Sequence, residues 1–364
     1  DLAKILDPND PTPWLYDAIQ KQTQNQPVEA LKDIQKSIEL NDNRAVYRSG
    51  LLLDQDEATR GTSLARIYDN LGFEKRAVVE TARSLSLDPA NHSAHRFLSD
   101  AYIKIPLHTA ARTSELLQAQ LLQPININPV QPPLAIDDFN ILTETGVTTT
   151  GFNEFTPLME RNKSQLIASS IVGSNSTFGD EIVFSKLLDK TSISLGQYHF
   201  QTDGFRPNND QKHNIYNAFM QYAVTPNFNV QAEIRRRETK HGDLLLDFDP
   251  KVFDSRQRRK LKQDTARVGA RYMLSPRQDF IVSAMYKDRR EGITLSPAPQ
   301  VNINSPGKEQ GYQVEGQYLF RGDLLNIVAG GGVFQVDVTK QEQVCVDFCL
   351  PSSEINFQRE NIKA

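Results

Sequence analysis

The sequence predicts an α+β protein of two parts: an N-terminal α-helical solenoid and a C-terminal antiparallel transmembrane β-barrel. Helical periodicity fills residues 1–123, and from about residue 164 apolar and polar residues alternate at every second position. The connections between the alternating segments are short and long in turn. That asymmetry is typical of barrels with tight turns at one rim and long loops at the other.

The clearest alternation runs from Tyr216 to Arg237, and it predicts a strand, a tight turn at 225–227 and a second strand. Its even-numbered positions are mostly apolar, whereas Glu233 and Arg235 stand on the opposite face. A packed sandwich core would reject such charges. We therefore expect lipid outside and a polar lumen inside, with a soluble antiparallel sandwich as the alternative.

Ten strands are predicted, which leaves open whether the barrel is complete: 164–174, 180–188, 191–200, 212–224, 228–239, 264–274, 279–289, 310–320, 324–337 and one from about 354. The long loops are predicted at 201–211, 240–263, 290–309 and 338–353. The first strand would rise from the tight-turn rim, which is the periplasmic one. Because the first strand starts at the periplasmic rim, the helical part that precedes it is predicted to lie in the periplasm.

Two sets of side chains follow from this assignment. Aromatic residues beside the tight turns predict an interfacial girdle: Tyr222, Phe228, Tyr272, Phe280, Tyr318 and Phe320. Charged residues on the polar faces are predicted to line the lumen: Glu233, Arg235, Arg237, Arg267, Arg271 and Glu315. The second set either forms a polar path that favours anionic passengers or braces a narrow lumen with internal ion pairs.

Composition excludes some classes. The 364 residues carry a net charge of −4 and a pI of about 5.9, so bulk charge gives no sign of nucleic-acid binding. Mean hydropathy is −0.49, and no apolar run is long enough for a transmembrane helix. Asp1 to Lys4 do not begin a signal peptide, so we expect a processed or longer N-terminus for an exported barrel.

The N-terminal part predicts stacked helix pairs. The first pair covers 11–23 and 27–40, with Asp10 as the expected N-cap. Two more pairs follow, and the third is interrupted at Pro106. Positions recur with a period of 34, since Ala77 and Ala111, for example, lie 34 residues apart.

These positions resemble the tetratricopeptide repeat over about 110 residues: Trp14, Ala18 and Ala30 in the first unit, Leu64, Ala65, Tyr68, Gly72, Ala77 and Pro89 in the second, and Leu98, Tyr102 and Ala111 in the third. The resemblance implies a scaffold that binds a peptide or protein. The alternative is a helical spacer.

Between the two parts, four prolines predict an extended linker at 124–136. The segment 137–163 either enters the lumen as a small plug or runs along the rim. Near the end of the chain, Cys345 and Cys349 are predicted to close a small disulfide ring in a loop.

Other motifs give weaker expectations. His92 and His95 share helical spacing and are expected to form a surface pair, and Arg321 to Asp323 are expected to form a turn. The basic run 256–262 is expected in a solvated loop, with anionic polysaccharide as a candidate ligand. No metal, cofactor or catalytic motif is found, so an enzyme is not expected.

As a whole, the chain resembles bacterial outer-membrane proteins with N-terminal tetratricopeptide repeats and a porin-like or TonB-receptor-like barrel. The resemblance implies a channel or secretion component that moves a solute or polymer across the outer membrane. Its expected partners are outer-membrane lipid, a periplasmic protein bound by the repeats, and an anionic polysaccharide or secreted polymer. The alternative is a non-conducting anchor for a surface complex.

Overall fold

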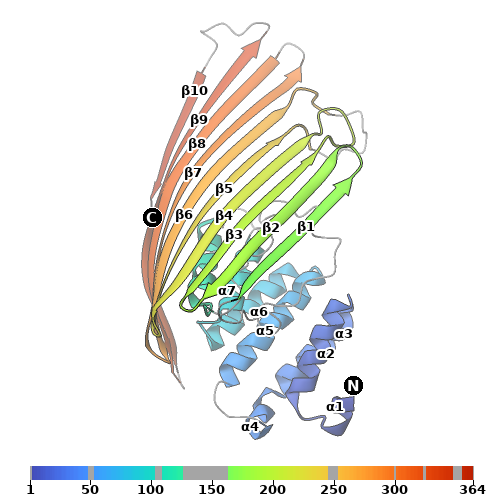
Figure 1. Cartoon of the computed structure of the whole chain (residues 1–364), viewed down its shortest axis with the longest axis vertical. Helices are drawn as coiled ribbons and strands as arrows, with labels where there is room; N and C mark the ends of the chain where they lie inside the picture. The colour runs from blue at the N-terminus through green and yellow to red at the C-terminus, as the bar shows by residue number, and fades with distance from the viewer. Residues whose placement is uncertain are drawn as a thin grey trace.

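The computed structural model describes residues 2–47, 53–102, 109–125, 163–244, 253–298, 301–322, 325–346 and 355–363. One large, curved antiparallel sheet dominates the chain, and the helices lie at its lower end, as Figure 1 shows. The linker from residue 126 and the segment 137–162 lie outside the described residues. The plug or rim prediction for that segment therefore stays a prediction.

The helical part follows the predicted pattern. Asp10 caps the first predicted helix, because its carboxylate accepts a hydrogen bond of 2.8 Å from the backbone nitrogen of Thr12. Three helix pairs pack in succession (α2 with α3, α5 with α6 and α7 with α8). The helices are α1 (Leu2–Leu6), α2 (Pro11–Thr23), α3 (Pro27–Glu39), α4 (Arg44–Tyr47), α5 (Leu53–Asn70), α6 (Glu74–Leu87), α7 (His92–Tyr102) and α8 (Thr109–Leu122), with a 3₁₀ turn at Asn41–Asn43.

The core of the helical part is apolar. Ala30, Ile34 and Ile67 are fully buried and pack against one another between α2, α3 and α5. A second cluster joins Ala77 of α6 to Phe97 of α7. Small alanines let neighbouring helices approach closely, so successive pairs share buried residues. That these pairs are tetratricopeptide repeats stays a prediction. None of the described helices combines the length and the hydropathy needed to span a membrane.

All ten predicted strands are present in one sheet, and each pairs with its neighbour in sequence. The strands are β1 (Ser164–Gly173), β2 (Thr177–Leu188), β3 (Thr191–Thr202), β4 (Gln211–Thr225), β5 (Phe228–His241), β6 (Arg258–Ser275), β7 (Gln278–Ala298), β8 (Val301–Arg321), β9 (Asn326–Val346) and β10 (Ile355–Lys363).

The later strands are longer than the sequence predicted. Strands β7, β8 and β9 each have 21 residues and absorb most of the predicted loops 290–309 and 338–353. The basic run was also wrongly placed in a loop, because Arg258 to Lys262 lie inside β6. The outward positions of the added part of β6 are charged (Arg258, Lys260 and Lys262), and those of β7 to β9 are mostly small or polar. They lack the outward apolar row of the central strands, so the sequence pattern was read as loop.

The predicted closed barrel is not formed by the described residues. Strand β1 pairs with β2 and β10 pairs with β9, and no backbone ladder joins β1 to β10. The sheet is therefore an open, curved wall. In β1 nearly every residue is exposed, including Leu166 and Val172 at 65% and 78%. An unpaired, apolar edge of this kind is a site where a further strand can add.

Candidate functional site

The concave face of the sheet carries polar and charged residues, here called the inner wall. Glu233 of β5 is 5% exposed and forms an ion pair with Arg267, which lies opposite it on β6. Asn217 of β4 donates a hydrogen bond of 2.6 Å to the same carboxylate. Their chain neighbours point outward: Ile234 and Val268 are 64% and 57% exposed. The sheet thus buries charge and exposes apolar side chains, which is the reverse of a soluble core.

Helix α8 lies against this inner wall and satisfies several of its polar groups. The Ser114 hydroxyl donates a hydrogen bond of 2.6 Å to the Glu315 carboxylate of β8. The Gln120 amide donates to Glu233 at 3.4 Å. A Cβ atom at Gly269 of β6 would lie 2.9 Å from a methyl carbon of Leu121, so the absence of a side chain at this position lets the helix approach closely.

The C-terminal ends of two helices are tied to the sheet. Arg271 donates a hydrogen bond of 2.9 Å to the carbonyl of Leu122, the last residue of α8. The amide of Asn326 donates to the carbonyls of Ser86 and Leu87 at 2.9 and 3.0 Å, at the end of α6. Helix C-termini leave carbonyls unsatisfied and carry partial negative charge, so these donors stabilise both the helices and their position.

A line of charges extends this attachment along the tight-turn rim. Asp279 of β7 is fully buried and pairs with Arg271 and Arg321, both at 2.7 Å. Arg321 lies 3.9 Å from Asp88 in the connection between α6 and α7. Burial raises the pKa of Asp88, against the opposing effect of its hydrogen bond from Ala90 and of the Arg321 charge. The rim therefore holds the helical part through paired rather than isolated charges.

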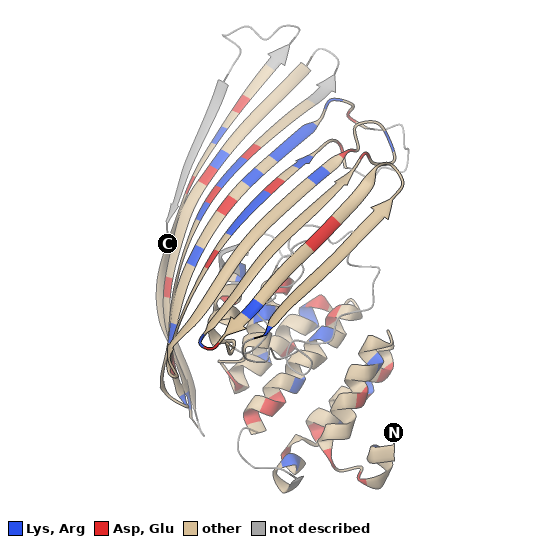
Figure 2. Ribbon diagram, viewed as in Figure 1, with Lys and Arg blue, Asp and Glu red and all other residues tan. Residues whose placement is uncertain are grey.

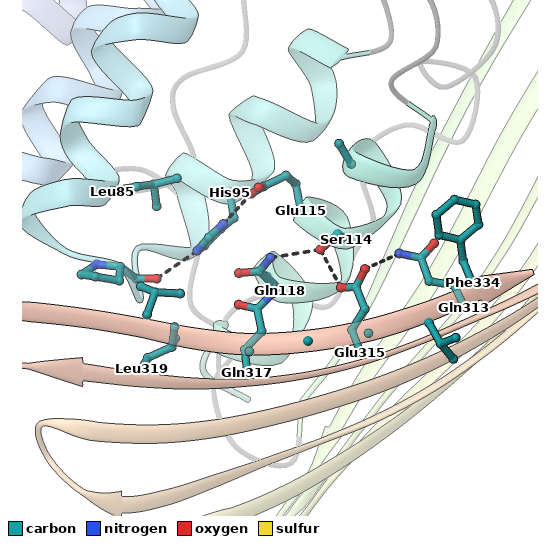
Figure 3. Close-up of a pocket in the computed structure, with 17 residues that line it drawn as sticks. Leu85, His95, Ser114, Glu115, Gln118, Gln313, Glu315, Gln317, Leu319 and Phe334 are labelled. Carbon is teal, nitrogen blue, oxygen red and sulfur yellow. Dashed lines mark hydrogen bonds and ion pairs between the residues drawn. The ribbon is translucent and has the colours of Figure 1, made fainter. Parts of the chain in front are cut away.

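A cavity of about 690 Å³ remains between the helices and the glycine-rich part of β9 (Figure 3). His95 faces it, held by Glu115 at 2.5 Å and by the carbonyl of Pro89 at 3.0 Å. Glu315 accepts hydrogen bonds from Ser114 and from Gln313 across the floor. Gly330 and Gly332 lie opposite Gln317 and Glu315, and a Cβ atom at either glycine would come within 2.8 Å of those side chains, so the glycines leave room for them. The lining is mixed: polar groups from α8 and β8 stand beside apolar side chains such as Leu319, Val333 and Phe334.

The histidine prediction was wrong. His95 is 6% exposed and lies in the interface between helix and cavity, not on the surface. Burial, with the nearby charges of His95 and Arg271, lowers the pKa of His92 to about 4. Both side chains therefore lie on the covered side of α7: His95 contacts Glu115 of α8 and the carbonyl of Pro89, and His92 lies near Arg271 of the sheet. Their helical spacing located them on one face but gave no sign of which face was covered.

The other predicted residues fall on the expected faces. Arg235 and Arg237 are half-buried on the same face as Glu233. Four of the predicted girdle residues form one row across β5 to β8, because each lies opposite the next: Phe228, Tyr272, Phe280 and Tyr318. Tyr222 is exposed on β4, and Phe320 lies two residues beyond Tyr318 on β8. The roles of both sets in a membrane stay predictions.

The disulfide prediction falls outside the described part of the chain. Cys345 lies near the end of β9, and Cys349 is among the residues that the structure does not describe. Within the described ranges, no group of three His, Cys, Asp or Glu side chains is arranged to hold a metal ion.

Sequence reasoning missed the role of α8. Its residues 117–122 are buried without interruption, including Gln118 and Gln120. A helix of a repeat buries one stripe, whereas α8 has protein on two sides, namely α7 and the sheet. Leucine pairs at 116–117 and 121–122 were the available signal, because they place apolar groups on more than one face of the helix.

No protein-family model and no curated protein sequence matches the chain. Among solved structures, the ferric citrate transporter FecA in its unliganded form is similar over 54% of this chain and 32% of its own, with 12% identity and a TM-score of 0.46. The siderophore receptor PiuA from Acinetobacter baumannii is similar over 54% and 37%, with 10% identity and a TM-score of 0.41. The ferric yersiniabactin uptake receptor FyuA from Yersinia pestis is similar over 57% and 44%, with 10% identity and a TM-score of 0.40. The chain thus spans about a third of the length of the first two.

Proposed function

We propose that this chain forms part of the wall of an outer-membrane transport barrel, whose helical part docks on the inner wall and occludes the passage. The observation that carries the proposal is the reversed polarity of the sheet. Glu233 and Arg267 are buried on the concave face, whereas Ile234 and Val268 are exposed on the convex one. Such a surface is stable when the convex side meets lipid and the concave side meets water or polar protein.

The height of the apolar band fits this position. On β4 the outward residues are apolar from Tyr216 to Val224, which is roughly 27 Å along the strand. Strand tilt reduces that length to about 20 Å across the membrane, close to the band of known transmembrane barrels. The open edges at β1 and β10 would pair with further strands to close the wall.

The passenger is a polar solute or polymer, and the helical part acts as its gate. Support comes from the cavity beside Glu315 and from the contacts of Ser114 and Gln120, which hold α8 against the wall. The tight-turn rim, where α6 and α8 are attached, would then face the periplasm. There the helical pairs would bind a partner protein that draws α8 away. In this role the chain catalyses no reaction.

A non-conducting anchor is the second candidate. It is favoured by the pairing of the inner-wall charges, since Glu233 with Arg267 and Arg271 with Asp279 neutralise each other. Under that alternative, α8 is a permanent structural filling, and the paired charges brace the wall. Both candidates place the sheet in the membrane, and they differ in whether α8 ever leaves the wall.

A reversible cross-link between α8 and the wall separates the two candidates. Leu121→Cys with Gly269→Cys, in a background with Cys345→Ser and Cys349→Ser, brings two thiols within reach of a disulfide, because these positions are in contact. Solute flux through proteoliposomes is expected to be low when the pair is oxidised and to rise on reduction. The matched controls carry Leu121→Cys alone and Gly269→Cys alone, since a side chain at position 269 by itself alters the approach of α8. Equal flux in the oxidised and reduced states contradicts a gate and favours the anchor.

A further inference from the structure

The convex face of the sheet carries a concentration of basic residues above the apolar band. Figure 2 shows the charged stripes of β5 to β8 gathered in the upper part of the sheet, toward the long-loop rim. A hollow of about 670 Å³ lies there across β5 to β9. Five cations line it, here called the basic cluster: Lys240, Lys260, Lys262, Arg290 and Lys308.

The strand register fixes the height of the cluster. Ile234, Ala266, Tyr286 and Tyr312 lie opposite one another and form the last apolar row on this side. Lys262, Arg290 and Lys308 form a row four residues further along β5, and Lys240 and Lys260 lie opposite each other two residues beyond that. With strand tilt, the cluster lies roughly 10 to 15 Å above the apolar band. Headgroups begin at that band, and long lysine side chains reach back toward them.

The rows differ in how completely their charged side chains are paired. In the row next to the apolar band, Arg236 donates two hydrogen bonds to Asp264, at 2.6 and 3.0 Å, so that pair is neutral. Higher up, Lys262 pairs with Glu238 at 3.4 Å and Arg290 with Asp288 at 3.4 Å. Glu291, the other carboxylate of the hollow, is held by Arg259 and Arg289.

Three lysines of the cluster have no such partner. Within the described ranges, no carboxylate forms an ion pair with Lys240, Lys260 or Lys308, and all three are exposed. Lys212 of β4 lies opposite Lys240, which lies opposite Lys260, so three like charges stand side by side on neighbouring strands. Like charges at directly opposed positions destabilise a sheet. An external anion between them would remove that cost.

We propose that the basic cluster binds the phosphate group of a membrane-lipid headgroup. The proposal rests on the proposed membrane position of the sheet. The lysines face away from the inner wall, on the same side as the apolar band, and they stand just beyond it. A phosphate on a lipid in the neighbouring leaflet meets them without leaving the membrane, whereas a soluble passenger in the lumen lies on the opposite face. Clusters of Lys and Arg at this height attract anionic lipids.

The test compares lipid selectivity at the two rims. The full chain is reconstituted in phosphatidylcholine nanodiscs that contain a minor fraction of spin-labelled phosphatidic acid, and the immobilised fraction of the label is measured. Lys240→Gln, Lys260→Gln and Lys308→Gln together are expected to lower the enrichment at least about tenfold, since each surface cation contributes roughly fivefold. The matched control removes three cations at the tight-turn rim: Lys163→Gln, Lys186→Gln and Lys190→Gln. The charge-preserving changes of the three cluster lysines to Arg are expected to retain the enrichment.

Each other outcome is decisive. If the protein inserts, as shown by flotation with phosphatidylcholine vesicles, but the label shows no enrichment, the lipid site is wrong and the membrane role stands. Equal losses in the cluster and control variants also overturn the site. If inorganic phosphate binds the chain more tightly than sulfate at equal ionic strength while the labelled lipid shows no enrichment, the cluster binds free phosphate instead. If the chain fails to float with any vesicle, the proposed function itself falls.

Discussion

The helical part and the sheet place the same residue type on opposite sides. Ile34 of α3 is fully buried among Ala30, Leu64 and Ile67, whereas Ile234 of β5 is 64% exposed. Conversely, Lys36 and Glu39 of α3 form their ion pair at the surface, whereas Glu233 and Arg267 form theirs inside. One chain therefore contains a region that hides its apolar groups and a region that displays them.

Under the proposed function, the two regions are suited to different solvents. A helical bundle in water gains stability from apolar burial, so Ile34 and Ile67 are packed away. A sheet whose convex face meets lipid gains nothing from hiding Ile234, because lipid chains are as apolar as the side chain. Its backbone ladders and its paired inner-wall charges must hold it together instead. Breaking these two kinds of support should have different consequences.

The largest effect is expected at the inner-wall ion pair. Glu233→Ala leaves Arg267 buried at 8% exposure without its carboxylate, and we expect the free energy of unfolding to fall by about 3 to 5 kcal/mol. Urea unfolding in detergent or lipid measures it. The double variant Glu233→Ala with Arg267→Leu should recover most of the loss, since no charge is then stranded. A single variant as stable as the wild type would mean that water reaches Arg267 freely.

Removing the same three methyl and methylene carbons in each region tests the comparison directly. Ile34→Ala should destabilise the helical part by about 2 to 5 kcal/mol, because a cavity remains in a packed core. Ile234→Ala should cost less than about 1 kcal/mol, because lipid fills the space. Both values come from denaturant titration of the membrane-inserted protein. Equal costs would show that the convex face packs against protein, as in a sandwich.

A charge on the convex face distinguishes lipid from water. Val268 lies mid-band, opposite Ala232 and Ala284, and is 57% exposed. Val268→Arg should therefore cost about 2 to 4 kcal/mol in a bilayer, whereas the same change on a water-exposed sheet is nearly neutral. Folding yield into vesicles measures this, with Val268→Leu as the control. Normal folding of the arginine variant would place the convex face in water.

Much of the fold was predictable because its signals are local. Alternation of apolar and polar residues, together with the spacing of the turns, located the ten strands, although 164–200 and 324–337 alternate less cleanly. Asp10 with Pro11 located the start of α2. The alternation pattern failed to predict strand residues that lie beyond the apolar band, because no apolar side chains are needed on the outer face there. Beyond the apolar band the outer face of β6 carries Lys260 and Lys262, so the strand continues while the hydrophobic pattern stops. Closure also failed as a prediction, since no local pattern specifies whether β1 and β10 meet.

The candidate site was predictable only on the side of the sheet. Because successive side chains of a strand point to opposite faces, the sequence assigned Glu233, Arg267 and Arg271 to one face of the sheet. The structure brings these residues to the inner wall. Gln120 and Leu122, the partners of Glu233 and Arg271, lie more than a hundred residues away in a helix that the repeat pattern already explained. Contacts over that separation depend on how two domains dock. The periodicity of apolar residues within a helix or strand does not specify how the two domains dock.

The smallest expected effect concerns pH and the attachment of α7. The pKa of His92 is lowered from 6.5 to about 4, chiefly by burial and then by the nearby His95 and Arg271. Between those two values the unfolded chain binds more protons at this position than the folded chain does, so stability falls as the pH falls. The contribution is complete above about pH 6.5. By pH 5 we expect a loss of about 1 to 2 kcal/mol.

Because Arg271 also holds the end of α8, protonation of His92 should loosen the helices on the wall before the strands separate. Hydrogen exchange at pH 7 and pH 5 should therefore show faster opening of α7 and α8 at the lower pH, with β5 to β8 unchanged. The variant His92→Gln keeps a polar side chain that does not titrate, and it should abolish the difference between the two pH values. If the variant keeps the full pH response, another group releases the helices. Asp88 is not that group, because its raised pKa means that the folded chain takes up this proton more readily than the unfolded chain, so its contribution to stability does not fall with the pH.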